Sequence, residues 1–487
     1  MSMSRVVMRN LMFGVAGEAI AGVLNFLTLI LVARALGAAE FGVLSYIMAF
    51  VGVFQLFADL GLTNTLVREI ARERERVAEI MGALRPLAWA SSLFVFALIA
   101  ALGWSLSATT EIYQATLLLG LAVLATFHSF SYASVCRAFE EMGYNAAGNI
   151  SHKILQILLV MLALFMHTGV VGVAAAMLAA NLYQWLFFHI VVRKRYVPNL
   201  RWRVDVAYWR YLLLEAIPIG MAMVFRRANQ QVGTLVLTAL ATSTSVGLFN
   251  AAYKIVQMID MIPFTLSLPF FPPIARLAKE SPQRLFVLLE RVWRVFMIIA
   301  APIVVWLFIM APRLVELMFG AEYAAASATL RILTFAVLFL FVTALYAYLF
   351  LALQRQRFYT ISSGLCLLAN VLLGVLLIPH YGHTGAAVAA LAGEIIFCGS
   401  GAWLLYGLGL RLSLPRVFGI PLLLAITAVP VLWWALTASL VGAIACSVLY
   451  AVLYLGLVVL TRTLRNEERA FLIAFVLRRP VPSSEAV

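Results

Sequence analysis

Charged residues are scarce in this sequence. Only 11% of its 487 residues are Asp, Glu, Lys or Arg, whereas 64% are hydrophobic. A soluble domain carries roughly 25% charged and roughly 45–50% apolar residues. No soluble core could bury this much apolar surface, because burial is limited by the ratio of surface to volume. The composition therefore predicts a chain surrounded by lipid, with almost no soluble part.

Sequence signatures of metal sites and common enzymes are also missing. The four cysteines, Cys136, Cys366, Cys398 and Cys446, show no CxxC or Cys/His ligand spacing, and each lies in or beside an apolar run. We expect them to be small packed residues. The six histidines form no HxxxH or HExxH pattern, and no Walker loop, GxSxG or dinucleotide fingerprint occurs. The sequence therefore predicts no metal site, no cofactor and no enzymatic activity.

Apolar runs long enough to cross a membrane are abundant. A transmembrane helix needs about 20 mostly apolar residues, and this criterion gives about fourteen spans. Their expected boundaries are 11–33, 41–66, 84–105, 112–135, 151–167, 169–192, 211–241, 246–270, 291–311, 328–353, 358–378, 385–407, 416–438 and 440–461. We therefore expect an all-α membrane protein.

Basic residues follow the connections between these spans. The net charge is +14, but the 35 Lys and Arg residues form no compact basic domain, so nucleic acid is not an expected partner. If the connections alternate between inside and outside, starting inside, the inside segments hold all but six of these residues. The six are Arg34, Arg313 and Arg331 outside, and Arg226, Arg227 and Lys254 within spans. Because cytoplasmic loops are rich in Lys and Arg, we expect both termini to be cytoplasmic.

Three polar stretches have their own predicted roles. Residues 68–80 (REIARERERVAEI) mix Glu and Arg at helical spacing and predict a solvated helical linker with ion pairs. Aromatic residues around the 193–210 connection are expected to anchor it at the membrane surface. Residues 466–479 predict a short amphipathic helix on the cytoplasmic leaflet.

An internal repeat relates the two halves of the chain. GVLS at 42–45 matches GLFN at 247–250 with an offset of 205, and GVAAA at 172–176 matches GAAVA at 385–389 with an offset of 213. The order and the offsets suggest that six spans were duplicated. We therefore expect a six-helix lobe over 1–205, a second over 206–410, and two further helices with a cytoplasmic tail over 411–487. Transporters with such parallel repeats place their substrate between the lobes.

Ionisable residues within spans are costly, at roughly 2.5–3.5 kcal/mol each, and therefore mark candidate polar cavities. They are Glu18, Asp59, Glu215, Arg226, Arg227, Lys254, Asp260 and Glu394. We expect Arg226, Arg227 and Lys254 to form a cationic pocket for an anionic head group, because arginine offers a bidentate fork for phosphate and lysine a point charge. The alternative for Arg226 and Arg227 is that they lie near the inner end of their span and extend to the cytoplasm.

Two of the acidic residues are candidates for a second role. Glu18 could couple transport to protons or pair with an arginine, and the sequence leaves both alternatives open. Asp59 lies near the end of its span, where capping of a turn competes with a role in the cavity. Asp260 and Glu394 are weaker candidates.

Several motifs resemble those of bacterial polysaccharide-biosynthesis flippases, a family in the superfamily that also contains multidrug/toxin extruders and the lipid II flippase. The motifs are ARALG at 33–37 with EFG at 40–42, ADLGL at 58–62 with Arg68, VGLFNAAYK at 246–254, FGAEY at 319–323 and IPHYG at 378–382. One departure concerns the amides Gln230 and Gln231, at a position where relatives often carry an acidic residue. This departure puts ion coupling there in doubt.

The resemblance implies two six-helix lobes around a V-shaped cavity, sometimes with two added helices. It implies flipping of an undecaprenyl-pyrophosphate-linked oligosaccharide across the bacterial inner membrane by alternating access, for O-antigen, capsule or exopolysaccharide synthesis. Membrane lipids, a polysaccharide polymerase and chain-length proteins are the implied partners. The alternatives are a cation-coupled multidrug antiporter of the same fold and, from another class, a membrane-embedded glycosyltransferase or ligase. The last would need a larger outer loop or a catalytic acid in a loop.

Overall fold

The computed structural model describes residues 3–59, 61–198, 201–407, 419–461 and 463, and these residues form helices and connections without a β-strand. Between the longer helices lie three short 3-10 helices, Arg74–Arg76, Leu268–Phe270 and Ala321–Tyr323. The α-helices are α1 (Met3–Asp59), α2 (Leu62–Arg72), α3 (Val77–Leu106), α4 (Thr110–Ala138), α5 (Met142–Phe165), α6 (Gly169–Arg195), α7 (Val206–Leu240), α8 (Ser243–Ser267), α9 (Phe271–Glu280), α10 (Pro282–Phe319), α11 (Ala326–Thr343), α12 (Tyr346–Ala352), α13 (Gln356–Gly407), α14 (Ile420–Thr427), α15 (Val429–Ala435) and α16 (Leu440–Leu460).

The prediction of an all-α membrane fold is confirmed. Each of the fourteen expected spans overlaps described helices: α1 and α13 hold two spans each, whereas the tenth span is divided between α11 and α12 and the thirteenth between α14 and α15. These two long helices bend at Gly37 (φ 73°) and Gly382 (φ 53°), where only glycine adopts the backbone angles without strain. Ten helices of the described ranges are long and apolar enough to cross a membrane. The chain is therefore a multi-pass membrane protein.

Two predicted boundaries are wrong. The second span was expected to run through residue 66, but α1 ends at Asp59 and α2 starts at Leu62 after Gly61, whose φ is 84°. The fifth span was expected to begin at residue 151, but α5 begins at Met142. As a result Lys153, which the loop assignment placed on the inside, lies in the middle of a candidate membrane span.

The linker prediction is confirmed with one break. Helix α2 stops at Arg72, and the chain continues through the short 3-10 helix to α3. Arg76 bonds to Glu73 at 2.5 Å and to Glu79 at 3.1 Å, both at i,i+3 spacing. The predicted amphipathic helix over 466–479 lies outside the described residues.

The connection after α6 is held by side chains and backbone. Tyr196 donates to Glu141 at 2.5 Å, and burial together with this carboxylate raises the pKa of the Tyr196 hydroxyl. The Arg203 amide donates to the Gly82 carbonyl at 3.1 Å, and the Trp209 indole N–H donates to the Ala83 carbonyl at 2.7 Å. The hydrogen bonds of Arg203 and Trp209 thus hold the connection against the start of α3.

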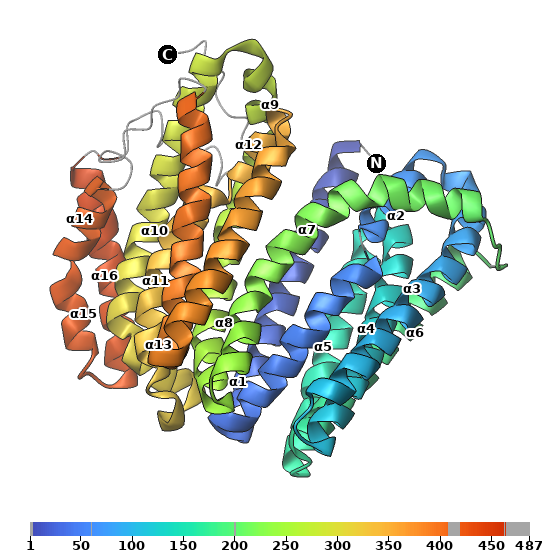
Figure 1. The fold of residues 1–487 in the computed structure, drawn as a ribbon. Coiled ribbons are helices and arrows are strands. Elements are labelled where there is room, and N and C mark those ends of the chain that lie inside the picture. The colour runs from blue at the N-terminus through green and yellow to red at the C-terminus, as the bar shows by residue number, and fades with distance from the viewer. Residues whose placement is uncertain (1–2, 60, 199–200, 408–418, 462, 464–487) are drawn as a thin grey trace. The chain divides into compact units, whose positions relative to one another are not determined.

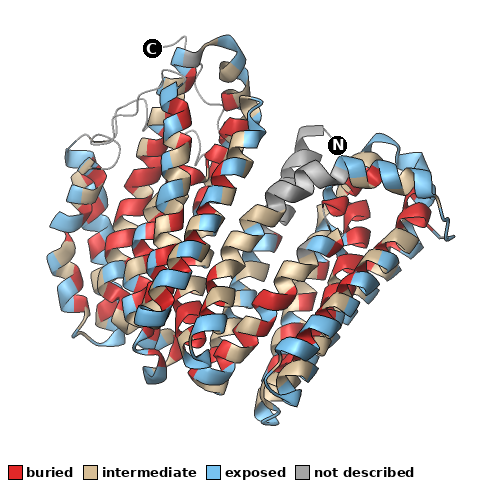
Figure 2. Ribbon diagram, in the orientation of Figure 1, coloured by how far each residue is buried: buried red, intermediate tan, exposed pale blue. Residues whose placement is uncertain are grey.

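The helices form two compact units. The first comprises Met1–Ala251 with Gly374–Ala386, and the second comprises Ala252–Leu373 with Ala387–Val487. In the first unit α4 packs between α3 and α6, while α5 packs against α1 and α6. Figure 1 shows α3 to α6 running side by side, and Figure 2 shows buried positions along these helices.

Two glycines related by the repeat make a reciprocal contact in the first unit. A methyl group at Gly42 of α1 would lie 1.8 Å from the Ser243 carbonyl oxygen. A methyl group at Gly247 of α8 would lie 2.0 Å from the Ala38 carbonyl oxygen. Each glycine therefore admits the backbone of the other helix, as small residues do where membrane helices pack closely.

A second pair of glycines shares a positive φ angle. Gly169 is the first residue of the sixth predicted span and Gly382 precedes the twelfth, and the repeat offset of 213 relates them. Their φ angles are 61° and 53°. Both tight junctions therefore favour glycine, because positive φ angles are costly for residues with a side chain.

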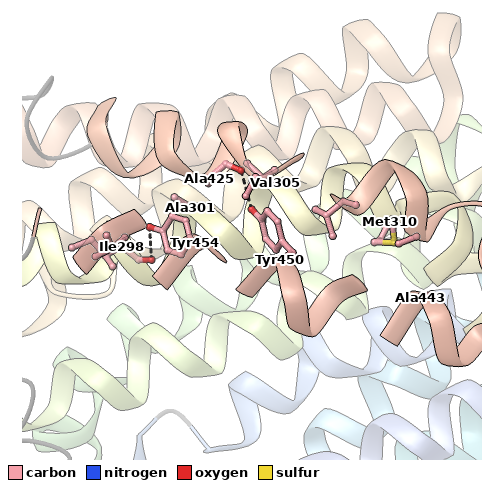
Figure 3. Packing of buried hydrophobic residues seen from close by; sticks show 12 residues of the cluster. Ile298, Ala301, Val305, Met310, Ala425, Ala443, Tyr450 and Tyr454 are labelled. Carbon is pink, nitrogen blue, oxygen red and sulfur yellow. Dashed lines mark hydrogen bonds between the residues drawn. The ribbon is translucent and has the colours of Figure 1, made fainter. Parts of the chain in front are cut away.

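The second unit contains a packed core made largely by α10, α14, α15 and α16 (Figure 3). Tyr454 of α16 donates to the Ile298 carbonyl of α10 at 2.9 Å, and Tyr450 donates to the Ala425 carbonyl of α14 at 3.3 Å. The Trp306 indole also donates to Ser447 at 2.9 Å. Hydrogen bonds between helices are effective in lipid, where water does not compete for the donors.

The cysteines match their predicted role in part. All four are free thiols; Cys136 and Cys366 are buried, and Cys398 and Cys446 are half-buried. Tyr346 donates to the Cys398 carbonyl at 3.0 Å, which ties α12 to α13.

Candidate substrate-binding site

Asp59 stands at the junction of α1 and α2 in the first unit. Its Oδ1 atom accepts hydrogen bonds from the Thr63 amide at 3.0 Å and from the Thr63 hydroxyl at 2.5 Å. The amides of the first helical turn have no partner within the helix, so this carboxylate caps α2. The capping alternative for Asp59 is therefore confirmed.

Arg137 in the last turn of α4 faces the same junction. Its Nη2 donates to the Ser134 hydroxyl at 3.1 Å, and its Nε is buried without a hydrogen-bond partner. The charges of Asp59 and Glu18 both act on its guanidinium. Glu18 itself is exposed on α1. An arginine with an unsatisfied buried donor can still receive an anion.

The sequence did not nominate Arg137. It follows the apolar run of the fourth predicted span, so the positive-inside count assigned it to an inside connection. The helix continues through Ala138, which places the guanidinium beside the intramembrane acids. In the sequence, the only indication of its role was its position directly after the fourth predicted span; the structure places it opposite Asp59.

Arg226 and Arg227 lie in the interior of α7. By the helical rise they are roughly 30 Å from Val206 and roughly 20 Å from Leu240 along the axis. Arg226 is half-buried and Arg227 is exposed. Arg227 experiences the repulsive charge of Arg226 and the attractive charge of Asp59. The structure thus brings Arg227 and Asp59 within electrostatic range, and Arg137 links the same carboxylate to Glu18.

Glu215, the remaining acid of the seventh predicted span, pairs with α2. Arg68 Nη2 lies 2.6 Å from Glu215 Oε2, and the Tyr211 hydroxyl donates to Glu69 at 3.2 Å. These contacts fasten the first part of α7 to α2. Both side chains of the Arg68–Glu215 pair are partly exposed, so its contribution to stability is small.

Lys153 is a second basic residue that the sequence analysis missed. Its ammonium group donates to Asn25 of α1 at 2.9 Å and to Gln156 of α5 at 2.8 Å. It is half-buried in the middle of α5. This lysine therefore adds a positive charge within the membrane-spanning part of the first unit.

Lys254 belongs to α8 in the second unit. It is half-buried and donates to Gln257 at 2.8 Å. Its neighbour Tyr253 interacts electrostatically with Glu394 of α13 and with Asp260 of α8. The two weaker acidic candidates thus gather around Tyr253, one residue from Lys254.

Of the two amides Gln230 and Gln231, Gln231 packs against α1. A methyl group at Gly52 would lie 3.3 Å from the Gln231 Nε2 atom. Gln231 therefore occupies a close contact between α7 and α1. In the first unit Asp59 thus lies within electrostatic range of Arg137 and Arg227, and Arg226 adjoins Arg227, an arrangement suited to holding an anion.

A family model described as polysaccharide biosynthesis protein matches residues 7–278, more than half of the chain. The chain belongs to this family. The expected family is thereby confirmed.

Two curated relatives match at low identity. The capsular polysaccharide biosynthesis protein CapF of Staphylococcus aureus is 23% identical over 205 residues, covering 42% of this chain and 52% of CapF. The uncharacterized membrane protein MJ1068 of Methanocaldococcus jannaschii is 22% identical over 275 residues, covering 54% of each. The chain spans about half the length of the curated relatives that it matches.

Solved structures of transporters share the fold. The lipid II flippase MurJ in an inward closed conformation has a TM-score of 0.74 at 13% identity, covering 96% of this chain and all of MurJ. An inward-facing multidrug resistance transporter of the MATE family has a TM-score of 0.62 at 16% identity, covering 80% and 94%. A transporter of the MOP superfamily from Pyrococcus furiosus, described as having a binding pocket of reverse polarity, has a TM-score of 0.59 at 15% identity, covering 83% of this chain and 94% of that one. These similarities establish the transporter fold.

Proposed function

We propose that this protein flips an undecaprenyl-pyrophosphate-linked oligosaccharide across the bacterial inner membrane by alternating access. The product would serve O-antigen, capsule or exopolysaccharide synthesis. Family membership, a capsular polysaccharide relative and the fold shared with a lipid II flippase support this proposal. The polysaccharide polymerase and chain-length proteins are its proposed partners, and both termini are proposed to be cytoplasmic.

The observation that carries the proposal is the excess of arginine beside Asp59. Arg137, Arg226 and Arg227 bring three positive charges to a region where Asp59 and Glu18 bring two negative ones. A pyrophosphate diester would bring two negative charges, which offset the remaining positive charge, and would accept bidentate hydrogen bonds. We assign pyrophosphate binding to Arg226 and Arg227, and we separately propose Lys254 as a phosphate-binding residue.

The acids have a different proposed role. In the absence of substrate, Asp59 and Glu18 would neutralise part of the arginine charge, because unpaired charges in a membrane are costly. Substrate would then compete with the carboxylates for the guanidinium groups. Glu18 and Asp59 are both proposed as coupling or ion-pair carboxylates, and Asp59 in addition accepts the hydrogen bonds that cap α2.

A flipping assay in reconstituted vesicles tests the proposal. Arg226→Ala/Arg227→Ala and Lys254→Ala should each slow the flipping of a fluorescent undecaprenyl-pyrophosphate-oligosaccharide by about tenfold or more, because hydrogen bonds to charged groups are worth about 1.5–3 kcal/mol. Arg226→Lys/Arg227→Lys should retain part of the rate, since lysine keeps the charge but not the fork.

Arg72→Ala is the matched control, because Arg72 is an exposed arginine on α2 in the same unit. Its rate should equal that of the unmodified protein. Normal flipping by the double alanine variant would refute the assigned site. Uptake of cationic dyes without any flipping would instead support the multidrug antiporter.

A further inference from the structure

The first half of α1 has two exposed faces. Seven residues separate Glu18 from Asn25, so these two exposed side chains lie on the same face of the helix. Ile20, Val23 and Leu27 are 48%, 46% and 46% exposed, and helical periodicity places them roughly 140–200° around the axis from Glu18. Exposed apolar residues of a membrane helix contact lipid, whereas ionisable residues face a polar interior. Glu18 and Asn25 therefore mark a polar surface that faces away from the lipid.

Helix α5 brings a lysine to this polar surface. A methyl group at Gly17 of α1 would lie 2.7 Å from the Ala146 Cβ atom of α5. Seven residues further along α5, the Lys153 ammonium donates to Asn25 at 2.9 Å. The two helices therefore run parallel at these contacts, and Lys153 lies roughly 10 Å along α1 from Glu18.

The lipid-facing side of α5 lies elsewhere. The exposed apolar residues of this helix are Ile154, Leu158, Met161, Leu162 and Phe165. By helical periodicity, their face is centred roughly 120° around the axis from Lys153. The half-buried lysine thus extends toward α1 and not toward the acyl chains.

The positive charge of Lys153 is not balanced by an acid. Its ammonium donates to Asn25 at 2.9 Å and to Gln156 at 2.8 Å, and both acceptors are neutral amides. Within the described ranges, no acidic side chain acts on it electrostatically. One of its three N–H donors therefore has no partner among these residues. Because an ionised group in a membrane is costly unless it is paired, an anionic group is favoured at this position.

Amide side chains surround the ammonium. Gln156 is buried and accepts from Lys153, whereas Asn25 is exposed. Behind them, Gln184 of α6 donates to Asn149 of α5 at 3.0 Å. Asn25 carries an amide nitrogen besides the oxygen that accepts from Lys153, so it can also donate to a ligand. Ammonium and amide donors together suit a ligand that carries both hydroxyl groups and an anionic group.

This polar site is separate from the arginines beside Asp59. The charges of Glu18 and Asp59 act on Arg137, whereas Lys153 lies roughly 10 Å further along α1. A pyrophosphate held by arginine therefore leaves Lys153 available to another part of the same substrate. In the proposed substrate that part is the oligosaccharide, in which acidic sugars carry the negative charge.

We propose that Lys153 and Asn25 bind the carboxylate of an acidic sugar and thereby select acidic oligosaccharides over neutral ones. This inference rests on the proposed flippase function and names the class of its substrate. The ammonium donates its third N–H to the carboxylate, and the Asn25 amide donates to the carboxylate or to a neighbouring hydroxyl. A neutral sugar offers hydroxyl groups but leaves the charge of Lys153 unbalanced.

Flipping of two matched substrates tests the proposal. The full-length protein is reconstituted in vesicles with fluorescent undecaprenyl-pyrophosphate disaccharides, which end either in glucuronic acid or in glucose. At low substrate concentration the acidic form should be flipped about tenfold faster, because hydrogen bonds between charged groups are stronger than neutral ones. Lys153→Gln should reduce this ratio of rates to about one. Asn25→Asp keeps the hydrogen bond but neutralises the ammonium, so it should reduce the ratio as well.

Lys194→Gln is the matched control, because Lys194 is an exposed lysine in the last turn of α6. It should keep the ratio of the unmodified protein. A purely structural role of Lys153 would lower both rates together, so an unchanged ratio in Lys153→Gln would overturn the proposal. Equal flipping of both substrates by the unmodified protein would also overturn it and leave the flippase function intact. Absence of any flipping would overturn both.

Discussion

Replacing Gly247 with alanine tests the close contact between α1 and α8. The added methyl group would lie 2.0 Å from the Ala38 carbonyl oxygen, whereas ordinary contacts begin at 3.4 Å. The two helices must therefore separate by about 1.4 Å, since the obstacle is backbone rather than a flexible side chain. Overpacking of this kind costs typically about 1–3 kcal/mol. We expect a lower melting temperature for the purified protein in detergent.

Gly143→Ala provides the control for helix propensity. Gly143 lies in the first turn of α5 and has no atom within 4 Å of the added methyl group. Alanine favours helix over glycine by roughly 0.5–1 kcal/mol, so this variant should be as stable as the original or more stable. The two substitutions therefore predict opposite signs. Equal melting temperatures of Gly247→Ala and Gly143→Ala would refute the proposed close contact.

A double substitution sharpens the test. Gly42→Ala should also destabilise, because its methyl group meets the Ser243 carbonyl oxygen of the same helix pair. Once one substitution has separated the helices, the second should cost less. The combined loss is therefore expected to be smaller than the sum of the single losses. If the losses of stability in the two single variants add up to the loss in the double variant, the two contacts are energetically independent.

The remaining predictions concern single contacts. Tyr454→Phe should cost about 0.5–1.5 kcal/mol, because the hydroxyl loses its bond to the Ile298 carbonyl, and thermal unfolding measures the loss. Gly169→Ala and Gly382→Ala should each cost about 1–3 kcal/mol through their positive φ angles, and at Gly382, whose ψ is −129°, asparagine should be tolerated no better than alanine; thermal unfolding measures both losses. Asp59→Ala should lose about 1 kcal/mol with the cap of α2, whereas Asp59→Asn should keep the cap and its melting temperature; a large destabilisation by asparagine would contradict the capping role.

The membrane fold could be predicted because lipid imposes a simple requirement on sequence. Long apolar runs with basic connections define the spans, and they identified every described transmembrane helix, including both halves of the bent helices α1 and α13. The requirement for a long apolar run also made the predicted fifth span shorter than α5, which begins at Met142. Its first part is polar, and Gln184 of α6 satisfies one of these groups by donating to Asn149 at 3.0 Å. Pairing between helices makes polar residues acceptable in a span, and a single run of sequence cannot reveal the partner.

The candidate site was predictable only in part for a related reason. Charge within an apolar run nominated Asp59 and Arg227, which the structure brings within electrostatic range. Arg137 and Lys153 escaped because they lie near the predicted ends of spans. Their positions depend on where α4 ends and α5 begins, and helix ends depend on neighbours as much as on local composition.

The hydrogen bonds from α16 to α10 have a consequence for biogenesis. Tyr454 and its acceptor Ile298 are 156 residues apart, so α10 is synthesised long before its partner. At typical elongation rates the delay is on the order of ten seconds. During that interval Ala301 and Val305 of α10, which are buried in the finished core, must be covered by lipid or by an insertion factor. Release of the nascent chain before α16 would leave the second unit open to membrane quality control.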